Sequence, residues 1–245
     1  SYAAVHVKFI VLFLLYFYLL MKKNILNILL QQQISQIKYE KKTIYRYMHE
    51  EEYIDMFAEG KIKVSTLDNC RKYENQEQGD SEEAKETFVV SHMTEKDPNF
   101  HKKANQLGMS FGNCSNVTIT NCTSTNHLPN GFIICTTSRR DDEKFAKDFG
   151  RFCVKINDAD KFFALVNNEI QKEFKLLGGD HKRVIYREQN YKDDELPPGK
   201  IGFVKRQKYT WQEEYRFLWL PQNFNQCETL YLDIPALKNI CERIL

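Results

Sequence analysis

The sequence predicts an α+β domain with antiparallel or mixed sheets and flanking helices. Segments with strand-like apolar patterns dominate the second half of the 245-residue chain, and helical patterns are interspersed among them irregularly. A steady strand–helix alternation, which would indicate a doubly wound parallel sheet, is missing. The sequence also contains no G-x-G-x-x-G or Walker loop, which argues further against a doubly wound nucleotide-binding fold.

The predicted elements of the first half depend on apolar spacing and on end signals. Acidic residues open one helix and Gly60 ends it. The polar run at 68–86 predicts a solvated loop, and the weakly patterned residues 94–130 predict a mobile insertion. The elements expected in order are a helix at 24–38, a strand at 43–48, a helix at 49–60, a strand at 61–66 and a strand at 87–93.

In the second half, short apolar runs predict strands and one long amphipathic pattern predicts a helix. We expect Gly178-Gly179 to stop that helix and Pro197-Pro198 to lie in a loop. The elements expected in order are a strand at 131–138, a helix at 141–149, a strand at 150–156, a helix at 158–177, strands at 182–189, 201–206, 213–220 and 228–233, and a helix after Pro235.

The first twenty residues differ in composition from the rest. Residues 7–21 are almost entirely apolar, but fifteen residues span only about 22 Å as a helix, less than the roughly 30 Å of a bilayer core. The segment is interpreted as a short membrane anchor, as a buried or oligomer-forming helix, or as a non-native extension before Met21. The change of composition at Met21 favours the extension. We therefore expect an apolar segment at 1–20 and one cytoplasmic domain at 21–245, with membrane attachment only if 7–21 is native.

Composition restricts the class of partner and site. Hydrophobic residues make up 42% and charged residues 28% of the chain, as in ordinary globular domains. A net charge of +2 gives no strong signature of nucleic-acid binding. The seven cysteines include no C-x-x-C pair and the six histidines show no metal-ligand spacing, so we expect no metal site. We expect mostly reduced, buried thiols, with Cys114 and Cys122 beside a polar loop as the exception.

The segment KYTWQEEYRFLWLP at 208–221 places charges inside an otherwise apolar strand pattern. On a strand, Gln212, Glu214 and Arg216 share one face. The opposite face, which carries Tyr215 and the next aromatic residues, would pack into a core. The simplest interpretation is that Glu214 pairs with Arg216 or with a lysine on a neighbouring strand, and the alternative is a carboxylate in an active site.

Three short blocks within about 43–220 resemble an uncharacterised bacterial protein family that is related to the ADP-ribosyltransferase fold of the arginine–serine–glutamate type. The first block runs from Tyr45-Arg46-Tyr47 to Gly60, and the second from Cys135 to Ser138. The third has the pattern aromatic–x–aromatic–Gln–x–Glu–aromatic–Arg after Lys205-Arg206. The intervals between the blocks, about 90 and 76 residues, are long for that fold and require insertions, one of which residues 94–130 could supply.

The resemblance implies an NAD-dependent ADP-ribosyltransferase or NAD glycohydrolase, with NAD as its substrate and no metal. It implies that Arg46, with Tyr47 beside it, meets the phosphates of NAD and that Thr136, Thr137 and Ser138 shape the nicotinamide pocket. It further implies that Gln212 and Glu214 carry the catalysis. Ser65-Thr66 is a rival for the hydroxyl role. Such domains serve as toxins or defence effectors of bacteria and phages, and the target could be protein, nucleic acid or a small molecule.

Those residue types suit the chemistry. Cleavage of the bond between nicotinamide and ribose passes through an oxocarbenium-like state, which a nearby carboxylate stabilises. An arginine offers paired donors to a pyrophosphate. Hydroxyl groups can hold the carboxamide of nicotinamide.

Two other functions remain open. Asp80 with Glu83-Ala84-Lys85 loosely matches the D…E-x-K pattern of metal-dependent nucleases, in which carboxylates and a lysine activate water at Mg²⁺. That pattern needs a buried strand, and here it lies in a polar run. The other alternative is a non-enzymatic or membrane-tethered interaction module in which the charged strand is structural.

Overall fold

The computed structural model describes residues 41–72, 80–112, 114–192, 195 and 199–245. The apolar segment 1–20 and the predicted helix at 24–38 lie outside these residues. Within the described residues, no helix has the length and apolar character needed to cross a membrane. Residues Lys41–Leu245 form one unit.

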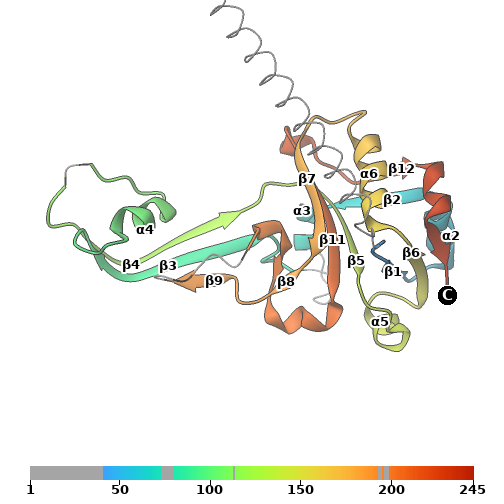
Figure 1. Cartoon of the computed structure of the whole chain (residues 1–245), viewed down its shortest axis with the longest axis horizontal. Helices are drawn as coiled ribbons and strands as arrows, with labels where there is room; N and C mark the ends of the chain where they lie inside the picture. The colour runs from blue at the N-terminus through green and yellow to red at the C-terminus, as the bar shows by residue number, and fades with distance from the viewer. Residues whose placement is uncertain (1–40, 73–79, 113, 193–194, 196–198) are drawn as a thin grey trace, which may run out of the picture. The chain divides into compact units, whose positions relative to one another are not determined.

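The α+β class is confirmed, because helices and largely antiparallel sheets alternate irregularly along the chain (Figure 1). The strands are β1 (Ile44–Met48), β2 (Lys61–Thr66), β3 (Lys85–Thr94), β4 (Thr118–His127), β5 (Phe132–Thr137), β6 (Phe152–Ile156), β7 (Leu176–Arg183), β8 (Ile185–Tyr186), β9 (Asn190–Lys192), β10 (Val204–Lys205), β11 (Glu214–Pro221), β12 (Leu230–Asp233) and β13 (Cys241–Arg243). The α-helices are α2 (Glu51–Ala58), α3 (Leu67–Lys72), α4 (Phe100–Gln106), α5 (Asp142–Asp148) and α6 (Ala159–Ile170), and the 3-10 helices are η1 (Ile201–Phe203), η2 (Gln207–Gln212), η3 (Phe224–Gln226) and η4 (Pro235–Asn239).

In the main sheet, β5 pairs with three strands, β1, β2 and β11. The order of the sheet is β12-β2-β5-β1-β6-β13, with β11 also on β5 and β7 on β11. Strand β11 pairs with the whole length of β5, so β1 and β2 must share the other edge of β5. They do so at opposite ends, because β1 pairs with it only at Thr137 and β2 only at Phe132 and Ile133. The two strands therefore diverge from β5 between these points.

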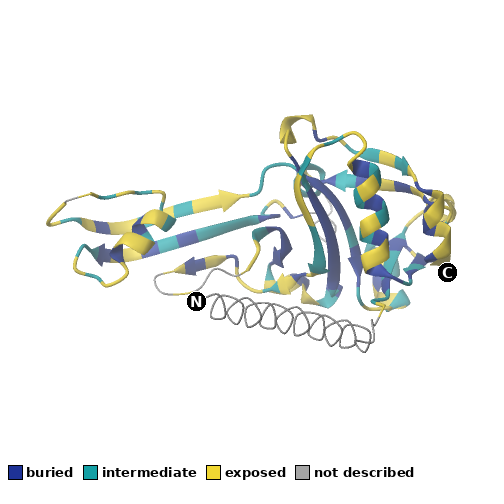
Figure 2. Cartoon of the chain, turned by 45° about the horizontal axis from the view of Figure 1, so that its top comes forward, coloured by how far each residue is buried: buried dark blue, intermediate teal, exposed yellow. Residues whose placement is uncertain are grey.

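The core lies between the main sheet and the helices α2 and α6. The rings of Phe57 on α2 and Phe217 on β11 lie 5.9 and 5.0 Å from the ring of Phe162 on α6. The aromatic face of β11 is buried in this core, as the sequence predicts. Its other face is buried too, and Figure 2 shows the central strands of the sheet in the colour of buried residues.

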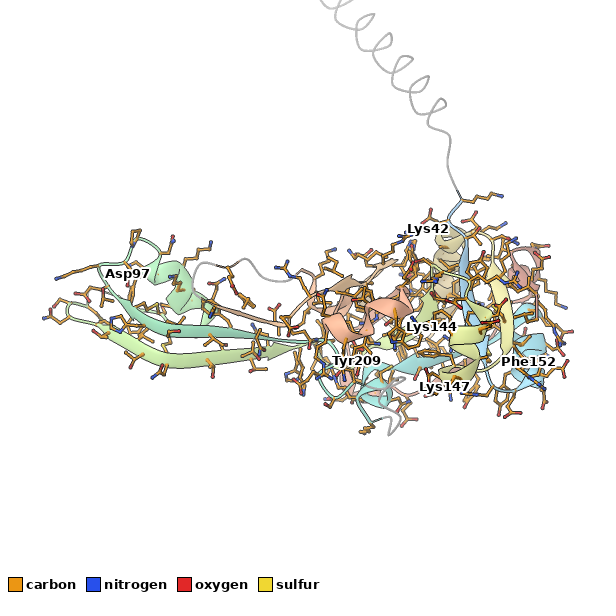
Figure 3. All side chains as sticks on the ribbon, turned by 90° about the horizontal axis from the view of Figure 1, so that it is seen from below. Lys42, Asp97, Lys144, Lys147, Phe152 and Tyr209 are labelled. Atoms are coloured by element: carbon orange, nitrogen blue, oxygen red, sulfur yellow. The ribbon has the colours of Figure 1, made fainter. Side chains whose placement is uncertain are left out.

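A second sheet, of order β4-β3-β9, includes much of the segment 94–130, where the sequence predicted a mobile insertion without regular structure. These residues form α4 and the ten-residue strand β4, which pairs with β3. The Oδ2 atom of Asp97, which is labelled in Figure 3, accepts a hydrogen bond from the backbone nitrogen of Thr94 at 2.6 Å. The strand β4 was missed because most of its residues are exposed, which removes the apolar alternation. Its β-branched threonines were the remaining signal.

The predicted helix at 158–177 ends early, at Ile170. Gly178 and Gly179 do not stop it, because both lie inside β7 and pair with β11. A Cβ atom on Gly179 would lie 2.8 Å from Cδ1 of Trp219, so the glycine lets the sheet approach that ring.

Other elements of the second half are shorter than expected. The strand predicted at 182–189 is divided at Val184 into β7 and β8. The segment 201–206 is η1 followed by the two-residue strand β10. The helix expected after Pro235 is the 3-10 helix η4, and β13 follows it because the chain end pairs with β6.

Gly60 ends α2, as the sequence predicts, with a φ of 95°. We expect Gly60→Ala to lower the free energy of unfolding by at least about 2 kcal/mol, since a side chain disfavours this φ and its Cβ would lie 2.2 Å from the carbonyl oxygen of Ile234. Thermal or denaturant unfolding measures the effect. Gly108→Ala is the control, because Gly108 has a φ of 76° but no atom lies within 4 Å of the place that a Cβ would take. Equal losses in both variants would show that the contact with Ile234 adds nothing.

Candidate functional site

A cleft with a volume of about 480 Å³ opens where β1 and β2 leave β5. The predicted site residues that line it are Arg46, Tyr47, Thr136, Thr137, Gln212 and Glu214. Ser65, the rival hydroxyl, lines it as well. Ser138 does not, and its hydroxyl donates instead to the carbonyl oxygen of Glu213 at 3.1 Å. The fold therefore brings together six of the seven residues that the sequence singles out.

The two predicted site residues on β1, Arg46 and Tyr47, form hydrogen bonds with other parts of the fold. The Nη1 atom of Arg46 donates to the carbonyl oxygen of Cys135 at 2.5 Å, across the split between β1 and β5. The hydroxyl of Tyr47 donates to Oδ1 of Asp142 at 2.6 Å, and its ring stacks on Phe145. Burial and the Asp142 contact raise the pKa of Tyr47. Both side chains thus have structural contacts besides their position on the cleft.

The threonines of β5 fix the start of β11. The hydroxyl of Thr136 donates to the carbonyl oxygen of Tyr215 at 2.6 Å, and that of Thr137 donates to the carbonyl oxygen of Gln212 at 2.8 Å. These bonds join the C-terminal end of β5 to the junction of η2 and β11. They explain why two hydroxyl residues stand in an otherwise apolar strand.

Gln212 does not belong to the strand, contrary to the prediction. It ends η2, and Glu213 follows in a left-handed conformation with a φ of 39°. This turn directs Glu213 outward, where its side chain is 42% exposed and lies 3.6 Å from Arg139. Gln212 and Glu214 still converge, because both accept from Nζ of Lys205, at 2.9 and 3.1 Å.

Behind the cleft lies a buried ion cluster of Glu83, Lys205, Glu214 and Arg216. Nε of Arg216 donates to Oε1 of Glu214 at 2.8 Å. Its Nη1 and Nη2 atoms donate to the two carboxylate oxygens of Glu83 at 2.7 and 3.2 Å, and Nη1 also donates to the carbonyl oxygen of Gly202 at 2.7 Å. Glu83, Lys205 and Glu214 line the cleft, and Arg216 is fully buried behind them. The simplest interpretation is therefore confirmed in its ion pairing, because Glu214 pairs with Arg216 and with a lysine. That lysine lies on β10, which pairs with β8, and not on a strand beside β11.

The polar run at 68–86 is not simply a solvated loop. It contains the helix α3, and Asp80 and Glu83 are buried, with 3% and 4% of their surfaces exposed. Asp80 pairs with Arg206, and Glu83 pairs with Arg216. Sequence reasoning missed both partners because nothing in a run of charges tells which of them meet a cation far along the chain.

The nuclease alternative needs Asp80, Glu83 and Lys85 together, but each of these residues pairs with a different partner. Each of the two buried acids meets a different arginine, and Lys85 pairs with Glu82 at 3.3 Å. Among the residues that the structure describes, no group of three or more His, Cys, Asp or Glu side chains could hold a metal ion.

All seven cysteines are free thiols, and Cys114 and Cys122 form no disulfide.

The cluster fixes the protonation state of its members. Burial alone would raise the pKa of Glu214, but Arg216 and Lys205 outweigh burial and hold it well below its usual range. Burial alone would lower the pKa of Lys205, but Glu214 and Glu83 raise it. Its ammonium also lies 4.7 Å from the ring centre of Tyr209, labelled in Figure 3. Glu214 is thus a fixed anion at neutral pH and cannot serve as a general acid there.

The thiol of Cys135 lies next to this cluster. A hydrogen bond with Cys70, followed by burial and the charge of Glu214, raises the pKa of Cys135 well above its usual range. The site therefore contains a neutral thiol beside the ionised carboxylate of Glu214.

Comparison with protein-family models, curated proteins and solved structures gives no match to this chain.

Proposed function

We propose that the cleft binds NAD and that the protein cleaves the bond between nicotinamide and ribose, transferring the ADP-ribosyl group to an acceptor or to water. One observation supports this above all. The ionised Glu214 on β11 lines the same cleft as Arg46 on β1 and as Thr136 and Thr137 on β5. The resemblance in sequence assigns these residues to NAD, and three adjacent strands bring them together. The proposal includes the ADP-ribosyltransferase-like form of the α+β fold and a role as a bacterial or phage toxin or defence effector.

In the proposed reaction, the bond from the ribose C1′ atom to the pyridinium nitrogen breaks. Its electron pair goes to the nitrogen, so nicotinamide leaves as a neutral molecule. The ribose carries the positive charge until a nucleophilic oxygen or nitrogen bonds to C1′ and releases a proton. A fixed carboxylate stabilises that charge without taking up a proton. Lys205 and Arg216 keep Glu214 ionised and hold it in place, and we assign them as positioning residues.

Protein that binds NAD should unfold at a higher temperature in its presence, because a ligand selective for the folded state stabilises it. At a concentration 100 times the Kd, the expected gain is about 2.7 kcal/mol. Thermal unfolding with millimolar NAD, with and without EDTA, measures this gain. We expect the same shift in both, since the described residues offer no metal site. A shift that EDTA abolishes, or no shift at any concentration, would contradict the proposal.

A second function has an observation in its favour. Both carboxylate oxygens of Glu214 already accept from cations, and its side chain is only 5% exposed. A module that binds a nucleotide without cleaving it would need this cluster only to hold the floor of the cleft. Stabilisation by NAD with no release of nicotinamide over hours would favour that binding module over the enzyme.

A further inference from the structure

The mouth of the cleft carries exposed aromatic and apolar side chains. Tyr231 on β12 is 77% exposed and Tyr53 on α2 is 58% exposed, yet both line the cleft. Met56 lies three residues after Tyr53, on the same side of the helix, and is 38% exposed. Single exposed apolar residues are common, but a group around one opening marks a binding surface.

Two lysines stand beside these rings. Lys61 and Lys63 alternate with buried residues on β2, so both point to the exposed side of that strand. Lys63 lies directly opposite Tyr231 in the pairing of β2 with β12. Both lysines line the cleft, and neither forms an ion pair with another described residue. The mouth thus combines rings that can stack with cations that are available to a ligand.

We propose that this mouth binds the adenosine diphosphate half of the dinucleotide. In this arrangement the adenine ring stacks on Tyr231, the more exposed of the two rings and the one opposite Lys63, and Lys61 and Lys63 contact the two phosphates. Stacking on an aromatic side chain and contact with a basic side chain are the two means by which proteins hold nucleotides without reading a base sequence. The inference rests on the proposed function, because it takes the ligand of the inner cleft to be NAD.

The register of the sheet supports the placement. Strands β12, β2, β5 and β11 are successive neighbours and β2 diverges from β5 beyond Ser65, so at least about 14 Å separate the strand of Tyr231 from that of Glu214. A dinucleotide must span such a distance to place its nicotinamide ribose at Glu214 and its adenine at the mouth. The Nη1 atom of Arg46 already donates to the carbonyl oxygen of Cys135, so Lys61 and Lys63 add two cations for the phosphates beside Arg46.

Calorimetric titration with ADP-ribose, which lacks nicotinamide, tests the mouth separately from the reaction. We expect Tyr231→Leu to weaken the binding of ADP-ribose at least tenfold, by loss of stacking. Tyr231→Phe keeps the ring and should stay within about threefold of the wild type. The Lys61→Gln/Lys63→Gln variant should bind weakly and lose most of the dependence on salt, because its phosphate contacts are gone. Phe224→Leu and Lys238→Gln, at exposed positions outside the cleft, are the matched controls.

Unchanged affinity in the Tyr231→Leu and lysine variants, or no binding of ADP-ribose by the wild type, would overturn the inference. The outcome also separates the two proposals. NAD cleavage with no effect of Tyr231 on ADP-ribose affinity means that the reaction is right and the mouth is wrong. Tyr231-dependent binding of ADP-ribose with no cleavage of NAD means that the mouth is right and the reaction is wrong.

Discussion

Glu214→Gln is expected to slow the cleavage of NAD by at least about 100-fold, equivalent to about 2.7 kcal/mol in the transition state. The carboxylate lines the cleft and is held ionised, and in the proposed reaction its charge would act as positive charge develops on the ribose. The affinity for NAD should change little, because the substrate in its ground state does not need that charge. Release of nicotinamide, measured over a range of NAD concentrations, separates the two effects.

The same substitution should also destabilise the fold, and a second variant separates stability from catalysis. In Glu214→Gln, two buried cations lose one charged partner, with an expected cost of about 3 kcal/mol. Adding Lys205→Met removes one of these cations, so Glu214→Gln/Lys205→Met should regain part of the stability. Arg216 still has Glu83 and the carbonyl oxygen of Gly202 as acceptors.

We expect this double variant to fold and to remain inactive. Glu213→Gln is the control, because Glu213 faces outward and does not line the cleft, and it should keep both stability and activity. A folded double variant that cleaves NAD at the rate of the wild type would rule out Glu214 as the catalytic carboxylate. An equal loss of activity in Glu213→Gln would show that the effect is not specific to the cleft.

Arg216→Met is expected to lower the free energy of unfolding by about 3–5 kcal/mol, which corresponds to a fall in melting temperature on the order of 10 °C. Arg216 is fully buried and donates to both glutamates of the cluster. Its loss leaves buried Glu83 without its hydrogen-bonded cation and leaves Glu214 with Lys205 alone. Arg216→Lys should recover little, because an ammonium cannot reproduce the fork of the guanidinium.

The matched variant is Glu83→Leu/Arg216→Met, which removes both members of this buried pair. Replacing a whole buried ion pair by apolar side chains is often neutral, so this double variant should be clearly more stable than Arg216→Met alone. Chemical denaturation of the four proteins of this cycle gives the coupling energy between the two positions. A coupling energy near zero would show that the contact between Arg216 and Glu83 contributes nothing to stability.

Local patterns in the sequence were sufficient for several central elements. The strands β1, β2, β3, β5 and β6 and the helices α2 and α5 lie where the apolar spacing and end signals predict them. These elements were predictable because burial of one face, or of a whole short strand, produces an apolar pattern among residues that are close in the sequence. The aromatic face of β11 follows from the same rule.

Elements stabilised by distant partners were less predictable. The strand β4 is mostly exposed and depends on its ladder with β3, so its polar sequence carried only a weak signal. The C-terminal residues 241–243 form a strand because β6 offers them an edge, where local sequence predicted a helix. Gln212 left the strand because Glu213 takes a left-handed conformation, which shifts where β11 begins.

The sequence by itself determined the α+β class and most of the main strands of the central sheet, and its resemblance named six of the residues that line the cleft. Only the tertiary structure decided that Glu83, in a run of charges, meets Arg216 at a position 133 residues later. It also decided that β1 and β2 share one edge of β5 and so open the cleft between them. The physical reason is that apolar periodicity is local, whereas the partner of a charge and the neighbour of a strand edge are set by chain segments that only folding brings together.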